Sequence, residues 1–171
     1  VIIVNSPPTS GSFSVTPLSG NALFDPFTFL TTKWVDVNLP LSYQFSYISN
    51  TMTDVVLITK GQISYGVSKL VSGDQMNNYM LVCVVMIYDS LNANSSSNSI
   101  VQVRPTTLLN SSDISTFVST SFSSISSPNS IKQAVAFSNS LLNVVQCSPL
   151  LNCSSIHRKD CLKTSNTCGA C

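Results

Sequence analysis

The chain has 171 residues, of which 43% are hydrophobic and 9% are charged, and its formal net charge at pH 7 is +1. The hydrophobic share excludes a disordered tail, and the near-neutral charge excludes a surface that binds nucleic acid through bulk charge. Small uncharged residues take the place of the usual lysines and glutamates: the chain has 32 Ser, 14 Thr, 15 Asn and no Glu. One domain of ordinary size, or two small ones, fits this length.

Residues 1 to about 105 show the period of two that is typical of β-strands. The clearest case is 41–47, where Leu, Tyr, Phe and Tyr alternate with Ser and Gln. The run 80–88 is apolar throughout, which predicts a buried strand. Further strands are predicted at 1–4, 12–16, 27–31, 54–63 and 100–103, with turn residues such as Ser19-Gly20-Asn21 between them. Six or seven strands at this spacing predict a mainly β fold, an antiparallel sandwich of about 100 residues.

The first strand has two interpretations. Val1-Ile-Ile-Val4 and Ile100-Val-Gln-Val103 are both short β-branched runs that end near a proline. Residues 1–6 are therefore either the closing strand of a preceding module in an array or an ordinary first strand of this domain.

The period changes to that of a helix between residues 107 and 146. A first apolar stripe follows Ser112-Asp113, whose side chains offer acceptors to the first free amides of a helix: Ile114, Phe117, Val118 and Phe122. A second follows Ser127-Pro128, the favoured order for a helix start: Ile131, Ala134, Val135, Ser138, Leu141, Leu142 and Val145. We expect a helical hairpin, with a partner-binding groove as the alternative.

Five of the six cysteines lie in the segment 147–171: Cys147, Cys153, Cys161, Cys168 and Cys171. A segment this short and polar cannot bury enough apolar surface to order itself, so disulfides are expected. Zinc is the competing interpretation, because Cys168 and Cys171 form a C-x-x-C pair. Cys83 is either a small core residue of the run 80–88 or the partner of a tail cysteine. In the first case one tail thiol pairs beyond residue 171 or with another chain.

Three N-x-S sequons agree with an oxidising, secretory setting, and they begin at Asn94, Asn110 and Asn152. Because the first residue is Val1 rather than Met, we expect a segment cut from a longer secreted polypeptide. The apolar run 80–88 has nine residues, far below the roughly 20 that a membrane-spanning helix needs. We therefore expect no membrane span in this segment.

The residues suited to catalysis or metal binding are isolated from one another. His157 is the single histidine, and neither a nucleophile nor an orienting carboxylate accompanies it apart from Asp160 nearby. The seven Asp are dispersed, and loops at one end of a sandwich could bring Asp36 and Asp89 together for calcium, although solvated turn residues are favoured. We expect no catalytic residue, no metal site and no cofactor.

Aromatic and basic side chains are interpreted in the same way. Trp34, Tyr43 and Tyr47 are candidates for a sugar-stacking platform, but the alternation favours core packing for the tyrosines. Lys33, Lys60 and Lys69 are dispersed charges at strand ends, where they protect strand edges from aggregation.

A family resemblance is carried by five segments in order: Val15-Thr-Pro-Leu-Ser-Gly20, Ala22-Leu23, Phe27-Thr-Phe29, Trp34-Val-Asp36 and Leu39-Pro-Leu-Ser-Tyr-Gln-Phe45. They resemble the opening of the receptor-for-egg-jelly (REJ) module of polycystin-type receptors and protist surface proteins. Lys33 stands where Gly is commoner before the Trp. Residues 153–161 and 166–171 resemble the Cys-rich, EGF-like stretch that follows such modules in protist proteins.

The resemblance implies an immunoglobulin- or fibronectin-III-like sandwich at 7–106 in an extracellular protein, and it implies no enzyme. Some relatives carry an autoproteolytic His-Leu-Thr or His-Leu-Ser site, but His157 is followed by Arg158. We expect a secreted, glycosylated structural or assembly segment, such as a repeating unit of a filament, cell-surface hair or glycocalyx fibre. Its expected partners are copies of itself, adjacent modules of the same polypeptide and attached glycans, with no nucleic acid. The alternative is a receptor ectodomain that binds a glycan or a protein.

Overall fold

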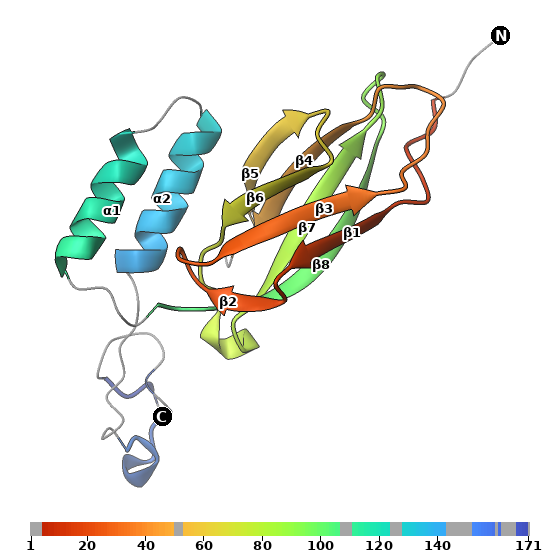
Figure 1. The fold of residues 1–171 in the computed structure, drawn as a ribbon. Coiled ribbons are helices and arrows are strands. Elements are labelled where there is room, and N and C mark those ends of the chain that lie inside the picture. The colour runs from red at the N-terminus through yellow and green to blue at the C-terminus, as the bar shows by residue number, and fades with distance from the viewer. Residues whose placement is uncertain are drawn as a thin grey trace.

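The computed structural model describes residues 5–49, 53–106, 111–123, 128–142, 152–159, 161 and 167–170. Within these ranges the chain is mainly β and carries two α-helices (Figure 1). The strands are β1 (Ser12–Thr16), β2 (Ser19–Asn21), β3 (Pro26–Thr32), β4 (Ser42–Ile48), β5 (Asp54–Gly61), β6 (Tyr65–Lys69), β7 (Met80–Tyr88) and β8 (Asn94–Arg104). The helices are α1 (Ser111–Ser123) and α2 (Pro128–Leu142), with short 3-10 turns η1 (Gln75–Asn77) and η2 (Ser154–Ile156).

The strands form two sheets. One has the order β1-β3-β6 and is antiparallel throughout. The other has the order β2-β8-β7-β4-β5, in which β2 runs parallel to β8 and the remaining neighbours are antiparallel. Alternating side chains give each sheet an inner face, which is turned towards the shared core, and an outer face, which is turned away from it.

One core lies between the two sheets. Phe29 of β3 and Phe45 of β4 are fully buried, and their ring centroids are 5.8 Å apart. Phe13 of β1 lies within 6.3 Å of the first ring and 6.0 Å of the second. Aromatic pairs contribute about 0.5–1.5 kcal/mol beyond the area they bury. The packing of these three rings is therefore a main source of stability between the two sheets.

Three strands differ from the sequence-based prediction. β2 was predicted as a turn, but Ser19 pairs with Gln102 of β8. β6 was not predicted, because its inward positions are occupied by Gly66 and Ser68 and give no apolar face. β8 begins at Asn94 rather than at residue 100, since its polar first half pairs with β7 through backbone hydrogen bonds that are indifferent to the side chain.

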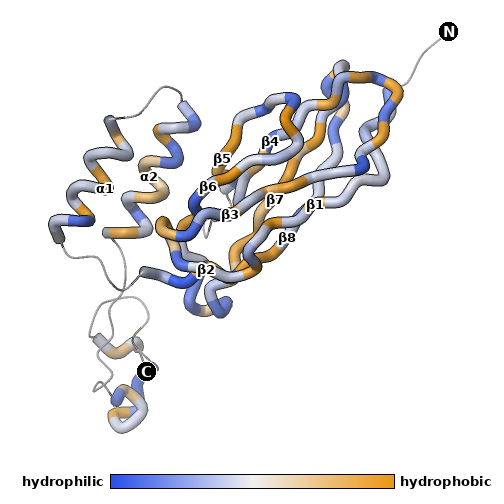
Figure 2. The backbone as a smooth tube through the Cα atoms, viewed as in Figure 1, coloured by the Kyte–Doolittle hydropathy of each residue, from blue (hydrophilic) through white to orange (hydrophobic). Residues whose placement is uncertain are grey.

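β7 is hydrophobic along most of its length (Figure 2). The prediction that it is a buried strand holds for its inner face, where Leu81, Cys83, Val85 and Ile87 are buried. Its outer face is only half-buried, or exposed at Met80, and we call it the β7 stripe: Met80, Val82, Val84, Met86 and Tyr88. The sheet therefore presents an apolar stripe in the middle of its outer face.

The two helices lie beside the edge strand β5, with α2 between α1 and the sheets (Figure 1). α2 begins at Pro128, as predicted, and buries Ala134, Ser138 and Leu141, which recur at helical spacing. α1 contacts α2 through Phe117 and Phe137, whose ring centroids are 6.4 Å apart. Tertiary packing stabilises these serine-rich helices, whose intrinsic helix propensity is low.

Candidate interaction surface

Three segments meet at the end of the sheets where β7 turns into β8: residues 5–9, residues 33–41 and residues 89–93. We call this end the N-terminal tip, and it lies nearest the label N in Figure 1. Asp89 is at its centre and is only 2% exposed. Its Oδ1 accepts hydrogen bonds from the backbone N–H groups of Leu91 (2.9 Å) and Ala93 (2.8 Å), and its Oδ2 accepts one from Nδ2 of Asn5 (2.6 Å). The carboxylate thus closes the β7–β8 turn and holds the N-terminal segment against it.

Asn38 extends this network to the connection between β3 and β4. Its Nδ2 donates to Oδ1 of Asn5 (2.6 Å), and its carbonyl oxygen accepts from the N–H of Ser90 (3.0 Å). Its own N–H donates to Oδ1 of Asp36 at 2.7 Å. Hydrogen bonds to a charged group contribute roughly 1.5–3 kcal/mol each, so the buried Asp89 fixes residues 5–9 against residues 89–93, and Asn38 adds residues 33–41 to the same arrangement.

The connection between β3 and β4 carries apolar side chains on its solvent side. Val35, Val37 and Leu39 alternate with Asp36 and Asn38, as in a strand, but here the polar residues point inward and the apolar ones outward. Val37 is 94% exposed, Leu39 67% and Val35 63%. A local cluster of exposed apolar side chains on a rigid base is typical of an interaction surface.

The sequence favoured Asp36 and Asp89 as solvated turn residues, and this interpretation is wrong for Asp89. Asp89 is buried, and both carboxylates accept hydrogen bonds from amide groups of the tip. Neither belongs to a group of three or more His, Cys, Asp or Glu suited to a metal ion within the part of the chain that the structure describes. Asn5 and Asn38 were missed by sequence analysis, although Asp36-x-Asn38 is a recognisable Asx-turn pattern.

The three aromatic candidates for sugar stacking lie in different environments. Tyr47 is 1% exposed and belongs to the core, where burial raises the pKa of its hydroxyl above the ordinary value. Tyr43 is half-buried against the core, and burial raises its pKa as well. Trp34 is half-buried, donates from Nε1 to Oγ1 of Thr31 (2.6 Å) and lies directly over Gly11. The three rings do not form one exposed platform.

The outer face of the three-stranded sheet also exposes apolar side chains. Leu30 of β3 lies opposite Tyr65 of β6, and both are exposed. Val67 of β6 is exposed next to them on the same face. The facing residues of β1 are Ser12, Ser14 and Thr16, so the β1 side of this second surface is uncharged, and Lys69 lies at the end of its β6 side.

The model of the REJ domain family matches residues 1–140. The chain belongs to the REJ domain family. The match covers both sheets, the N-terminal tip and nearly all of both helices, so it extends past residue 106. No curated protein matches the chain. REJ domains are extracellular modules of surface proteins.

Within the described ranges of this REJ protein, none of the helices combines the length and the apolar character needed to cross a membrane. His157 is exposed in the segment that follows the REJ match. Asp160, the carboxylate nearest to it in sequence, lies outside the described residues, as do Val1–Val4.

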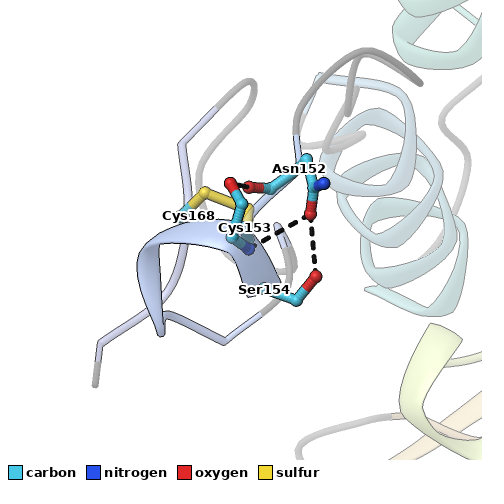
Figure 3. Close-up of a disulfide and its surroundings, with 5 residues drawn as sticks. Asn152, Cys153, Ser154 and Cys168 are labelled. Atoms are coloured by element: carbon cyan, nitrogen blue, oxygen red, sulfur yellow. Dashed lines mark hydrogen bonds between the residues drawn. A yellow bond between two sulfur atoms is a disulfide. The ribbon is translucent and has the colours of Figure 1, made fainter.

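The tail beyond the REJ match contains a disulfide between Cys153 and Cys168, with a Cα–Cα distance of 5.5 Å (Figure 3). Cys161 is also disulfide-bonded. Backbone bonds between Lys159 and residues 169–170 add order to this small segment. The sulfur of Cys168 is thus not a thiolate for a C-x-x-C zinc site. Cys147 and Cys171 lie outside the described residues.

Cys83 is a free thiol on the inner face of β7 and is fully buried in the REJ core. Burial raises the pKa of this thiol from its ordinary value of 9.0 to about 12. Because the thiolate is the reactive form, Cys83 packs as a small apolar side chain and does not exchange with the tail disulfides.

Two of the three sequons lie in the described residues. Asn94 is exposed at the start of β8, on the outer face of the five-stranded sheet. Asn152 is exposed in the tail, where its Oδ1 accepts from Oγ of Ser154 (2.7 Å) and from the N–H of Ser155 (3.2 Å) (Figure 3). Asn110 lies outside the described residues.

Proposed function

We propose that this REJ domain is a non-enzymatic structural module of a larger extracellular glycoprotein, and that it docks through its N-terminal tip. The partner is a copy of the same chain or a neighbouring module of the same polypeptide. The observation that carries this proposal is the inverted alternation of residues 35–39, in which Val35, Val37 and Leu39 face water while Asp36 and Asn38 are held inward.

Energetics support docking at this end. Burying a Val or Leu side chain contributes roughly 1.5–3 kcal/mol relative to leaving it in water. The network around Asp89 has already ordered the three segments of the tip, so association loses little further conformational entropy there. We expect the full interface to bury more than about 1,000 Å² of surface, as specific interfaces do.

The finer architecture that we propose follows the same reasoning. The two sheets and their shared core support an immunoglobulin- or fibronectin-III-like sandwich, and the contact between α1 and α2 supports a helical hairpin beside it. The tail disulfide supports an EGF-like, Cys-rich segment. In this proposal the protein is secreted, and such units repeat along a filament, a cell-surface hair or a glycocalyx fibre.

Sedimentation of the glycosylated protein over a range of concentrations tests the proposal. We expect reversible self-association that weakens at least tenfold in a variant with Val37→Asp and Leu39→Asp. The matched control is Ile63→Asp, which places a charge at another exposed apolar residue outside the tip. A protein that stays a monomer at high concentration, or that associates equally well with the tip charged, contradicts docking of like units through the tip.

The alternative function, a receptor ectodomain that binds a glycan, is favoured by a different observation. Tyr65 is an exposed aromatic ring on the outer face of the three-stranded sheet, flanked by Leu30 and Val67. Binding of a glycan library that is lost in Tyr65→Ala, with self-association absent, would favour this receptor function over assembly.

A further inference from the structure

Asn94 stands directly opposite Tyr88 in the antiparallel ladder between β7 and β8. Directly opposed side chains in such a ladder have Cβ atoms about 4.5–5.5 Å apart. Both residues are on the outer face, because the adjacent pair, Ile87 and Ser95, is on the inner one: Ile87 is fully buried, and Oγ of Ser95 donates to the carbonyl of Pro8 at 2.6 Å. The register therefore holds the Asn94 side chain beside the Tyr88 ring.

Lys60 lies over the Tyr88 ring. Nζ of Lys60 lies 4.1 Å from the ring centroid and donates to Oδ1 of Asn92 at 2.6 Å. Lys60 belongs to β5, which lies on the β4 side of β7, whereas Asn94 belongs to β8 on the opposite side. The lysine side chain thus reaches the ring from the β5 side of the sheet, whereas the register places Asn94 beside the ring on the β8 side.

The surface around Asn94 suits the apolar face of a sugar ring. Met86 continues the β7 stripe beyond Tyr88, and the residue opposite it is Ser96. The next residue opposite the stripe is Asn98, facing Val84, so the strip of β8 beside it is small and uncharged. The negative face of an aromatic ring attracts the weakly positive C–H groups that a pyranose presents.

We propose that an N-linked glycan is attached to Asn94 and that its first sugar packs over Tyr88 and Met86, shielding this part of the β7 stripe from water. Asn94 and Ser96, the two recognised residues of the sequon, both lie on the outer face. The donor is an oligosaccharide joined to a lipid diphosphate. The bond between Nδ2 and C1 of the sugar forms, the bond from C1 to the diphosphate breaks, the lipid diphosphate leaves, and the amide loses one proton. The inference rests on the proposed extracellular setting.

The sequon at Asn152 supplies an internal comparison. Its side chain is engaged with Ser154 and Ser155 in the tail, rather than with an aromatic ring on a sheet (Figure 3). A glycan on Asn152 is therefore not expected to contribute to the stability of the β unit.

The test uses the protein secreted from a eukaryotic host that attaches N-glycans. Peptide mapping by mass spectrometry is expected to find Asn94 occupied. Ser96→Ala, which removes the sequon but keeps Asn94, is expected to lower Tm by about 2–4 °C, the shift that corresponds to one aromatic-type contact in a chain of this size. Trimming the glycan to its first GlcNAc is expected to retain the full Tm, because that sugar makes the contact. Ser154→Ala, which removes the Asn152 sequon, is expected to leave Tm unchanged.

Two controls isolate the contact. Ser96→Ala made without glycans in bacteria must match the unglycosylated parent, so that the serine itself contributes nothing. In a Tyr88→Ser background, loss of the Asn94 glycan is expected to lower Tm much less than in the parent, because only the contact with Met86 remains. An unoccupied Asn94 beside an occupied Asn152, or an occupied Asn94 whose loss leaves Tm unchanged, would overturn the inference. Neither result bears on the self-association of the tip. The proposed function is tested separately, by sedimentation of the tip variants.

Discussion

The side-chain amide of Gln133 on α2 donates a hydrogen bond to the carbonyl oxygen of Val56 on β5, at 2.7 Å. The same Nε2 lies 2.8 Å from the carbonyl oxygen of Leu57. Phe45 pairs with Ile58 and Ser46 pairs with Val56, so Leu57 is the extra residue of a β-bulge. The bulge turns two successive carbonyls outward at the edge of the five-stranded sheet, and one glutamine satisfies both. The helix thereby closes an edge that would otherwise be open to another strand.

Gln133→Leu is expected to lower the free energy of unfolding by about 1–2 kcal/mol, because it removes the donor and leaves two half-buried carbonyls unpaired. Chemical denaturation measures this loss, and hydrogen exchange should show faster opening of β5. The neighbouring Lys132→Ala, at an exposed position of the same helix, is the matched control and should change stability by less than about 0.5 kcal/mol. Equal effects of the two substitutions would contradict a closing role for Gln133.

Asp89→Asn is expected to destabilise the protein by about 1–3 kcal/mol, since it sets an amide Nδ2 against the Nδ2 donor of Asn5. Asp54→Asn, at an exposed position of β5, is the control for loss of one negative charge. The double variant Asn5→Asp with Asp89→Asn restores a donor–acceptor pair with reversed polarity. Denaturation of the four proteins forms a cycle, and we expect the double variant to recover most of the loss. A double variant that is less stable than both single variants would refute the direct link.

Gly11→Ala is expected to cost about 1–3 kcal/mol, because a Cβ at position 11 would overlap the indole ring of Trp34. The ring must then move, and its hydrogen bond from Nε1 to Thr31 is lost or lengthened. Because Trp34 is the single Trp of the chain, its fluorescence reports the displacement directly as a shift of the emission to longer wavelength. Gly61→Ala is the control, since a Cβ there meets only a backbone oxygen at 3.8 Å.

The buried thiol of Cys83 predicts a loss of stability at alkaline pH. Its pKa is about 12 in the folded protein against an ordinary value of 9.0, so above pH 9 the unfolded chain binds fewer protons than the folded one. The free energy of unfolding therefore falls as pH rises from 9 towards 12, with a limiting slope of about 1.4 kcal/mol per pH unit from this group. The contribution is fully present below pH 9.

Denaturation of the parent protein and of Cys83→Ala between pH 7 and 10.5 measures this contribution. The cavity left by the smaller side chain lowers both ends of the curve equally, whereas the alkaline fall is expected to be shallower in the variant. The raised pKa of Tyr47 acts in the same direction in both proteins and cancels in the difference. If the free energy of unfolding falls equally with pH in both proteins, ionisation of Cys83 in the unfolded chain does not cause the alkaline loss of stability.

The strands that sequence analysis predicted well are those whose alternation coincides with burial. β3 shows strict alternation of buried and exposed residues along Pro26–Thr32, and β4 places Phe45 and Tyr47 in the core as its pattern indicated. α2 begins at Pro128 because a proline is suited to the first turn of a helix. Such signals are local: they depend on the geometry of the chain itself and can be read without knowledge of its partners.

Other features depended on which segment lies alongside. β2 and the first half of β8 are strands because a neighbouring backbone satisfies their hydrogen bonds, although their side chains are small and polar. Residues 35–39 alternate as clearly as β3 does. Their polar side chains point inward, however, because Asn5 and the β7–β8 turn offer hydrogen bonds on that side. An alternation of apolar and polar residues predicts that the two faces of a segment differ, but it does not predict which face is exposed to water.

The sequence by itself thus determined a mainly β chain with two added helices, a Cys-rich tail and a resemblance to the REJ module, since composition and period are properties of the chain alone. The tertiary structure decided what the surface offers. It buried Asp89 at the centre of the tip, exposed Val37 in the same tip, and set Asn94 opposite Tyr88. These relationships join residues far apart along the chain, and only strand pairing and loop packing bring their side chains within reach of one another.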